Sequence, residues 1–116
     1  MASRIEQLWL AYVQAGKQAI DDELEFRSYT GRAQYKLWNY DYQLERFFIE
    51  NLNTGRKNSS FGKGEFSNSM EKLLDADGVL VKGGLNSVDM HEFAIVHIHP
   101  QIDFDGEFIR LQYFSQ

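Results

Sequence analysis

Apolar residues recur at offsets of three and four along the first twenty positions, the spacing of one face of an α-helix. Ser3 precedes Glu6 by three residues, which is the spacing of a capping box. Gly16 weakens a helix by up to about 1 kcal/mol relative to Ala. The acidic run 21–23 is unfavourable at a helix C-terminus, where the dipole prefers cations. The pattern therefore predicts a helix that begins after Ser3 and ends at about Ile20.

Between Leu24 and Phe61 the pattern changes to the alternation of β-strands. Thr30-Gly31 and the segment 51–55 are predicted turns, because glycine supplies the positive φ that a tight hairpin needs. The segments on either side of these turns, including 32–42 and 44–52, are predicted strands. This region therefore predicts consecutive antiparallel hairpins.

In the second half, Phe66, Met70 and Leu73 share one helical face, and Ser67 is the expected cap of a short helix that ends at 75–78. Positions 90–99 alternate in a way that predicts a strand ending at Pro100. The segments 102–104 and 108–114, joined by an Asp-Gly turn, predict a closing hairpin. Together these elements predict an α+β fold: one antiparallel sheet of five to six strands, with the N-terminal helix and the short helix packed on one face.

Composition narrows the classes of protein that are possible. The chain has 116 residues, a formal charge of -5 and no Cys. This length fits a single domain, residues 1–116. The lack of Cys excludes disulfides and thiolate metal sites. No apolar run approaches the roughly 18 residues of a transmembrane helix, and residues 1–16 are amphipathic, unlike a signal peptide. We therefore expect a cytoplasmic protein without a membrane segment.

The three histidines lie within nine residues, at positions 91, 97 and 99. On a strand, His97 and His99 would point to the same face with Cα atoms about 6.6–6.8 Å apart, and Asp103 could supply a third metal ligand. The alternative is that each histidine is a hydrogen-bonded or solvated residue of the sheet. One hypothesis for function is therefore a metal-dependent hydrolase or nuclease centred on His97 and His99.

Short stretches around these histidines resemble motifs of two hydrolase families. Val96-His97-Ile98-His99 resembles the histidine strand of rolling-circle endonucleases, and His97-Ile98-His99-Pro100 resembles the His-x-His-Pro of JAMM-type metalloproteases. The first family also uses a tyrosine on a downstream helix, and the second a Ser-x-x-Asp pair. Neither second motif is found, so no family is assigned.

A glycine-rich segment, 54–64, is the one locally basic part of the chain. It contains Arg56, Lys57 and Lys63 and leads into the start of the predicted short helix, where backbone N–H groups favour anions. This arrangement suggests a binder of phosphate or nucleic acid, although the spacing is not that of a Walker A motif and the net charge of -5 disfavours nucleic acid. The alternative is an ordinary solvated hairpin loop.

Aromatic residues are unusually dense between positions 29 and 42. In a regular strand Trp38, Tyr40 and Tyr42 share one face and Tyr35 lies on the other. Two helices can cover only one face of the predicted sheet, so a second aromatic face would be left for a partner protein or for another copy of the chain.

The sequence contains no nucleophile–base pair, complete metal motif or cofactor fingerprint, so no cofactor is expected. We therefore predict a small non-enzymatic binding protein that engages a protein partner or itself through an aromatic sheet face and the adjoining loops. The predicted partner-binding residues are Tyr35, Trp38, Tyr40 and Tyr42.

Overall fold

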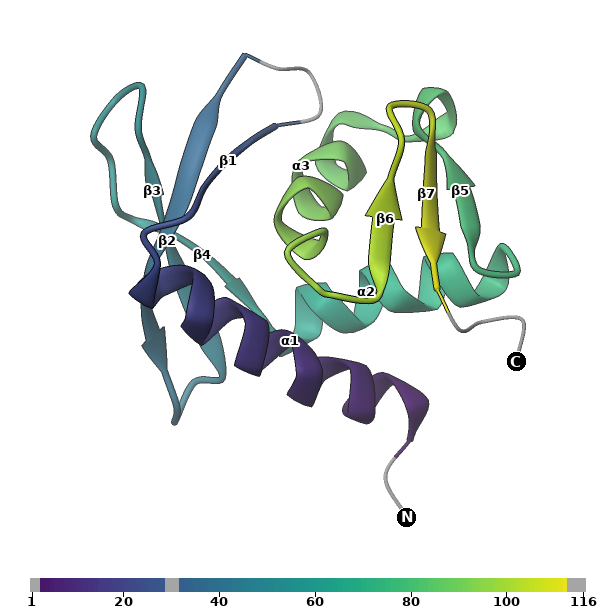
Figure 1. Ribbon diagram of the computed structural model, residues 1–116, viewed down its shortest axis with the longest axis horizontal. Helices are drawn as coiled ribbons and strands as arrows, with labels where there is room; N and C mark the ends of the chain where they lie inside the picture. Colours follow the sequence, from purple (N-terminus) through teal and green to yellow (C-terminus); the bar gives the residue numbers. More distant parts are fainter. Residues whose placement is uncertain (1–2, 29–31, 113–116) are drawn as a thin grey trace.

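The computed structural model describes residues 3–28 and 32–112, and in this part of the chain three α-helices pack with two antiparallel sheets (Figure 1). The α-helices are α1 (Arg4–Asp21), α2 (Lys63–Asp75) and α3 (Ser87–Val96), and a short 3-10 helix, η1, spans Lys82–Gly84. The predicted α+β class is confirmed. The prediction of one sheet with five to six strands is wrong, because the strands divide into a four-stranded and a three-stranded sheet.

The four-stranded sheet is a meander in the order β1-β2-β3-β4. Its strands are β1 (Glu25–Arg27), β2 (Gln34–Asp41), β3 (Arg46–Asn51) and β4 (Ser59–Gly62). The turn predicted at Thr30-Gly31 lies outside the described residues. The turn predicted at 51–55 is confirmed, because Gly55 has a φ of 76° and its N–H donates to the carbonyl of Asn51.

The three-stranded sheet has the order β5-β7-β6, with β5 (Val79–Val81), β6 (Ile102–Phe104) and β7 (Phe108–Leu111). The hairpin predicted at 102–114 is confirmed as far as Leu111. Its turn depends on Asp105, whose carboxylate accepts the N–H groups of Glu107 and Phe108. These two bonds and a bond from Arg110 lower the pKa of Asp105.

The strand predicted at 90–99 is wrong, since this segment contains most of α3. The side chain of Asn86 caps the helix by accepting the N–H of Asp89. The four residues 93–96 are all buried, so the second half of α3 is apolar on every side and shows no helical periodicity. The expected cap of α2 is also wrong, because Gly62 is the N-cap residue and Ser67 instead donates to the carbonyl of Lys63.

The helices and one face of each sheet form a single hydrophobic cluster. α1 packs on β2, and α2 contacts α1, α3 and β4. α1 approaches the sheet closely at Gly16, where a Cβ atom would lie 2.4 Å from the ring of Phe47. The helix therefore continues through Gly16 to Asp21, since packing compensates for its weak helix propensity. Within the described residues, no helix combines the length and apolar character needed to cross a membrane.

Candidate binding surface

A β-bulge divides the aromatic residues of β2 between the two faces of the four-stranded sheet. Leu37 pairs with Ile49 but Asn39 pairs with Phe48, so Trp38 is an additional residue in this strand. Tyr40 lies on the core side, with its ring centroid 4.5 Å from that of Phe47. The expectation that Trp38, Tyr40 and Tyr42 share one face is therefore wrong.

The other predicted partner-binding residues lie near helices. Tyr35 contacts Phe26 and His91, with ring centroids 5.9 and 5.6 Å away. The hydroxyl of Tyr42 accepts a hydrogen bond from Lys17 of α1, and the rings of Tyr40 and Tyr42 meet edge to face. Of these aromatic residues, only Trp38 lies on the face that turns away from the helices.

We call this face of the four-stranded sheet the outer face, and its centre is the pair Trp38 and Phe48. Their ring centroids are 6.1 Å apart, and Trp38 is 39% exposed. Phe48 follows the buried Phe47 in β3 and therefore points to the opposite side. The helices pack against the buried side (Figure 1), so no helix of the described chain covers Trp38 and Phe48.

Lys57, from the connection between β3 and β4, lies over the ring of Trp38 at 5.3 Å from its centroid. Such a cation–π contact contributes about 0.5–1 kcal/mol at an exposed site. Trp38 is therefore held between a cation and a second ring, which fixes its orientation on the outer face. Sequence reasoning missed Phe48, because Phe47, Phe48 and Ile49 are three successive apolar residues and only the burial pattern of β3 shows which of them faces outward.

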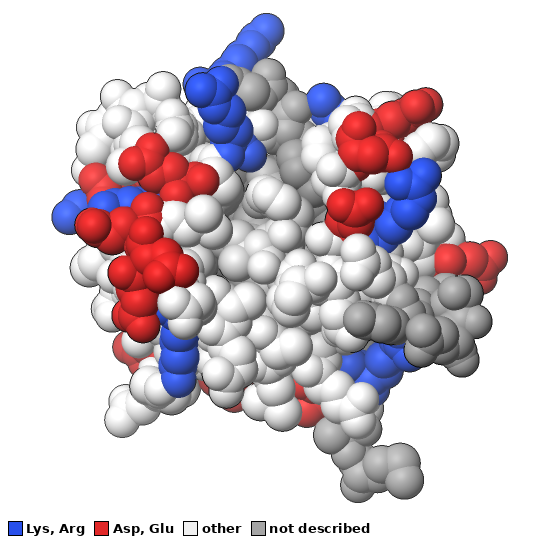
Figure 2. Space-filling model, viewed as in Figure 1, with Lys and Arg blue, Asp and Glu red and all other residues white. Residues whose placement is uncertain are grey.

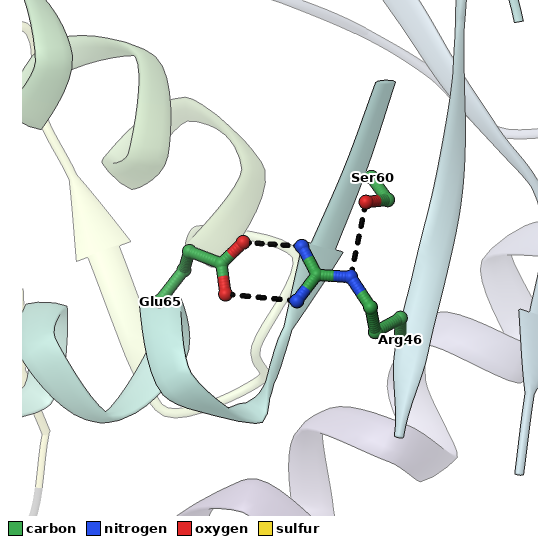
Figure 3. Close-up of polar contacts among 3 residues, drawn as sticks. All are labelled: Arg46, Ser60 and Glu65. Atoms are coloured by element: carbon green, nitrogen blue, oxygen red, sulfur yellow. Dashed lines mark hydrogen bonds and ion pairs between the residues drawn. The ribbon is translucent and has the colours of Figure 1, made fainter. Parts of the chain in front are cut away.

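Arg46, the first residue of β3, joins the four-stranded sheet to α2 (Figure 3). Its Nε donates to the hydroxyl of Ser60 at 3.0 Å, and its two terminal nitrogens bind the carboxylate of Glu65. These bonds lower the pKa of Glu65. A Cβ atom at Gly62 would lie 2.5 Å from the guanidinium of Arg46, so a side chain there would displace that of Arg46. Arg46 therefore has a structural role.

The start of β2 and the end of β3 meet at one end of the sheet, where the N–H of Leu52 donates to the carbonyl of Gln34 at 2.8 Å. We call this end the basic end. The residues 27–28, 32–34 and 51–59 that form it include four cations and no carboxylate; the cations are Arg27, Arg32, Arg56 and Lys57. Basic atoms lie at the top of Figure 2, and acidic atoms gather on the left and at the upper right.

Lys63 does not join Arg56 and Lys57. It lies beyond the opposite end of β4, in the first turn of α2, and pairs with the carboxylates of Glu6 at 2.6 Å and Glu45 at 3.7 Å. The hydrogen bond to Glu6 raises the pKa of Lys63. The predicted set of anion-binding residues is thus divided, with two residues at the basic end and one in an ion-pair network that joins α2 to α1 and to the β2–β3 connection.

His99 is fully buried, and both of its ring nitrogens have partners within the chain. Its Nδ1 accepts the N–H of Gln101 at 3.0 Å, so its Nε2 carries the proton and donates to the carbonyl of Leu8 at 2.9 Å. The ring stacks on those of Tyr12 and Phe66. Burial lowers the pKa of His99, which favours the neutral form of its ring. The two hydrogen bonds of the ring link α1 to the segment after α3.

His97 and Asp103 lie in different settings. His97 ends α3, and its Nδ1 is 2.6 Å from the carbonyl oxygen of Ala94, whereas Asp103 is exposed on β6. The strand geometry on which the metal hypothesis depended is therefore absent. In the part of the chain that the structure describes, no group of three His, Asp or Glu side chains is arranged to hold a metal ion.

Comparison of the chain with protein-family models, with curated proteins and with solved structures finds no match. The functional interpretation therefore depends on the geometry of the chain itself. The feature of greatest interest is the outer face with its exposed tryptophan and the adjoining basic end.

Proposed function

We propose that the chain is a non-enzymatic binding protein that contacts a partner protein through the outer face and the basic end. The observation that carries this proposal is Trp38, which is exposed on a sheet face that no described helix covers and is held in place by Phe48 and Lys57.

An exposed tryptophan on a rigid strand suits this role for energetic reasons. Tryptophan buries a large area on binding and loses little rotamer entropy, and such residues dominate the binding energy of protein interfaces. Because Phe48 and Lys57 already restrain Trp38, less of the binding energy is spent on ordering it.

The charges around Trp38 favour an acidic partner surface. Arg27 and Arg56 make no ion pair among the described residues, and the nearest carboxylate in the register of the sheet, that of Glu25, accepts a hydrogen bond from Gln34 at 2.7 Å. A partner with carboxylates beside an apolar pocket would match both features, and complementary charges would also accelerate its association.

The test is retention of proteins from the native cell extract on the immobilised chain, followed by affinity measurement with the purified partner. We expect Trp38→Ala to weaken binding by about 2 kcal/mol, or roughly 30-fold, as for an interface hot spot. Leu10→Ala is the matched control, because Leu10 is an exposed apolar residue of α1. Equal binding by Trp38→Ala and the wild type would contradict the proposal.

A second candidate, a single-stranded nucleic acid, is favoured by one observation: the ammonium group of Lys57 lies over the exposed ring of Trp38, which also contacts the ring of Phe48. Quenching of tryptophan fluorescence by an oligonucleotide tests it. Binding should fall steeply between 50 mM and 200 mM salt and should be lost in Arg56→Ala/Lys57→Ala. An unchanged fluorescence at low salt would remove this candidate.

A further inference from the structure

The connection between β3 and β4 is an exposed segment that ends at Ser59. Residues 53–59 are all exposed, and residues 55–58 belong to no helix, strand or turn. Ser59 then begins β4, which is the last strand of the four-stranded sheet and forms one of its edges. An exposed irregular segment that continues into an edge strand is accessible to an enzyme that modifies the chain.

The two serines of β4 differ in the environment of their hydroxyl groups. Ser60 is partly buried, and its hydroxyl accepts the Nε–H of Arg46 at 3.0 Å. Ser59 is exposed, and its hydroxyl makes no hydrogen bond within the described chain. Of these two hydroxyl groups, that of Ser59 is therefore the one that is free to react.

Two cations stand shortly before Ser59 in the sequence. Arg56 precedes it by three residues and Lys57 by two, and no other serine of the chain has an arginine at the first of these spacings. Neither cation makes an ion pair among the described residues; Lys57 lies over the ring of Trp38. Both are therefore available to an enzyme with an acidic substrate cleft. Protein kinases distinguish their substrates by charge patterns of this kind.

We propose that Ser59 is phosphorylated by a protein kinase that selects basic residues before the serine, and that the phosphate closes the basic end to an acidic partner. The second part rests on the function proposed above. In the reaction, the hydroxyl oxygen of Ser59 forms a bond to the γ-phosphorus of ATP, and its proton passes to a carboxylate of the kinase. The bond between that phosphorus and the oxygen of the β-phosphate breaks, and ADP leaves.

The phosphate changes the charge of the surface beside Trp38. It adds a charge of about −1.5 to −2 at pH 7, together with three acceptor oxygens. Arg56 and Lys57 are close enough along the chain to bind these oxygens, and they are then occupied when a partner's carboxylates approach. Lys57 also exchanges its contact with the ring of Trp38 for the phosphate, which removes one restraint on that ring. Both effects weaken the binding of an acidic partner.

Incubation of the full-length chain with ATP and a purified kinase that prefers arginine three residues before the serine tests the first part. We expect one phosphate per chain in the intact mass, located at Ser59 by fragmentation. Arg56→Ala should slow the reaction roughly tenfold or more, because it removes one charge-assisted contact with the kinase. The matched control is Arg4→Ala, which removes an exposed arginine of α1 and should react as the wild type does.

Three outcomes would overturn this part of the proposal. They are a native chain that takes up no phosphate, a phosphate located at another residue, and an Arg56→Ala chain that reacts as fast as the Arg4→Ala control. Circular dichroism of each variant verifies that its fold is that of the wild type.

The second part is measured with the partner that binds through Trp38. The phosphorylated chain should bind it roughly tenfold or more weakly than the unmodified chain. Ser59→Ala, taken through the same reaction, should keep its affinity. An equal affinity of the phosphorylated and unmodified chains would refute the regulatory role. Failure of the proposed function is distinguishable, because Trp38→Ala would then bind as the wild type does whereas Ser59 would still be phosphorylated.

Discussion

At the scale of single residues, close contacts in the core explain side chains that look unfavourable or functional in the sequence. Gly16 occurs in the middle of a helix because its missing side chain makes room for Phe47. His99 is a hydrogen-bonded part of the core, between the carbonyl of Leu8 and the N–H of Gln101. These roles depend on residues far away in the sequence, so local patterns could not reveal them.

Replacement of Gly16 by Ala should destabilise the fold even though alanine is the better helix former. The methyl group would lie 2.4 Å from the buried ring of Phe47, and overpacking of this kind costs about 1–3 kcal/mol. The matched control is Gly64→Ala in α2, where the added Cβ meets nothing within 4 Å. That variant should gain up to about 1 kcal/mol. Urea denaturation measures both changes, and a Gly16→Ala chain as stable as the wild type would contradict the packing described.

The buried His99 should make the free energy of unfolding depend on pH below neutrality. Burial lowers its folded pKa below the unfolded value of about 6.5, so the unfolded chain binds more protons in acid. Stability is therefore retained above pH 6.5 and falls as the pH decreases below it, towards the folded pKa. Thermal unfolding between pH 8 and pH 5 measures this dependence.

His91 also has a pKa lowered by burial, so its contribution has the same sign and must be separated. The slope that remains in His91→Gln contains the contribution of His99 together with that of Glu92, whose pKa is raised by burial and whose contribution therefore has the opposite sign. His99→Gln should reduce that remaining slope, because an amide can donate and accept a hydrogen bond but does not titrate there. An undiminished slope in the double variant would contradict this assignment.

At the scale of elements, the amphipathic segments were predictable and the fully buried or irregular ones were not. α1 and the β2–β3–β4 hairpins follow from their periodicity and glycine turns. α3 was mistaken for a strand, because four successive buried residues remove the polar face that marks a helix. The bulge at Trp38 results from the pairing of β2 with β3. The alternation within β2 alone therefore assigns Trp38 to the same face as Tyr40, which is wrong.

The start of α3 should depend on its cap. Asn86 accepts the N–H of Asp89, one of the backbone donors that a helix leaves without a partner. Asn86→Ala should therefore lower the free energy of unfolding by about 1 kcal/mol. Ser87→Ala, one residue further along, is the control and should change stability by less than about 0.5 kcal/mol. Equal effects of the two substitutions in denaturant unfolding would show that the cap contributes nothing.

At the scale of the whole molecule, the described helices pack on one face of the four-stranded sheet, and no described helix covers the other face. The sequence predicted this imbalance from the small number of helical residues, although it did not predict two sheets or a third helix. Division into two sheets could not be foreseen, because it depends on the location of α2 and α3 between the strands of the first and second halves. The candidate surface was accordingly predicted only in part: Trp38 is on it, whereas Tyr35 and Tyr40 face the helices.

The central claim is that Trp38 lies on an uncovered face of the isolated chain, and acrylamide quenching of tryptophan fluorescence tests it most directly. The chain has two tryptophans, and Trp9 is 1% exposed whereas Trp38 is 39% exposed. We predict two classes of emission at low micromolar concentration, one accessible to acrylamide and one protected, with the accessible class absent in Trp38→Phe. A single protected class in the wild-type chain, or an accessible class that persists in Trp38→Phe, would contradict the account.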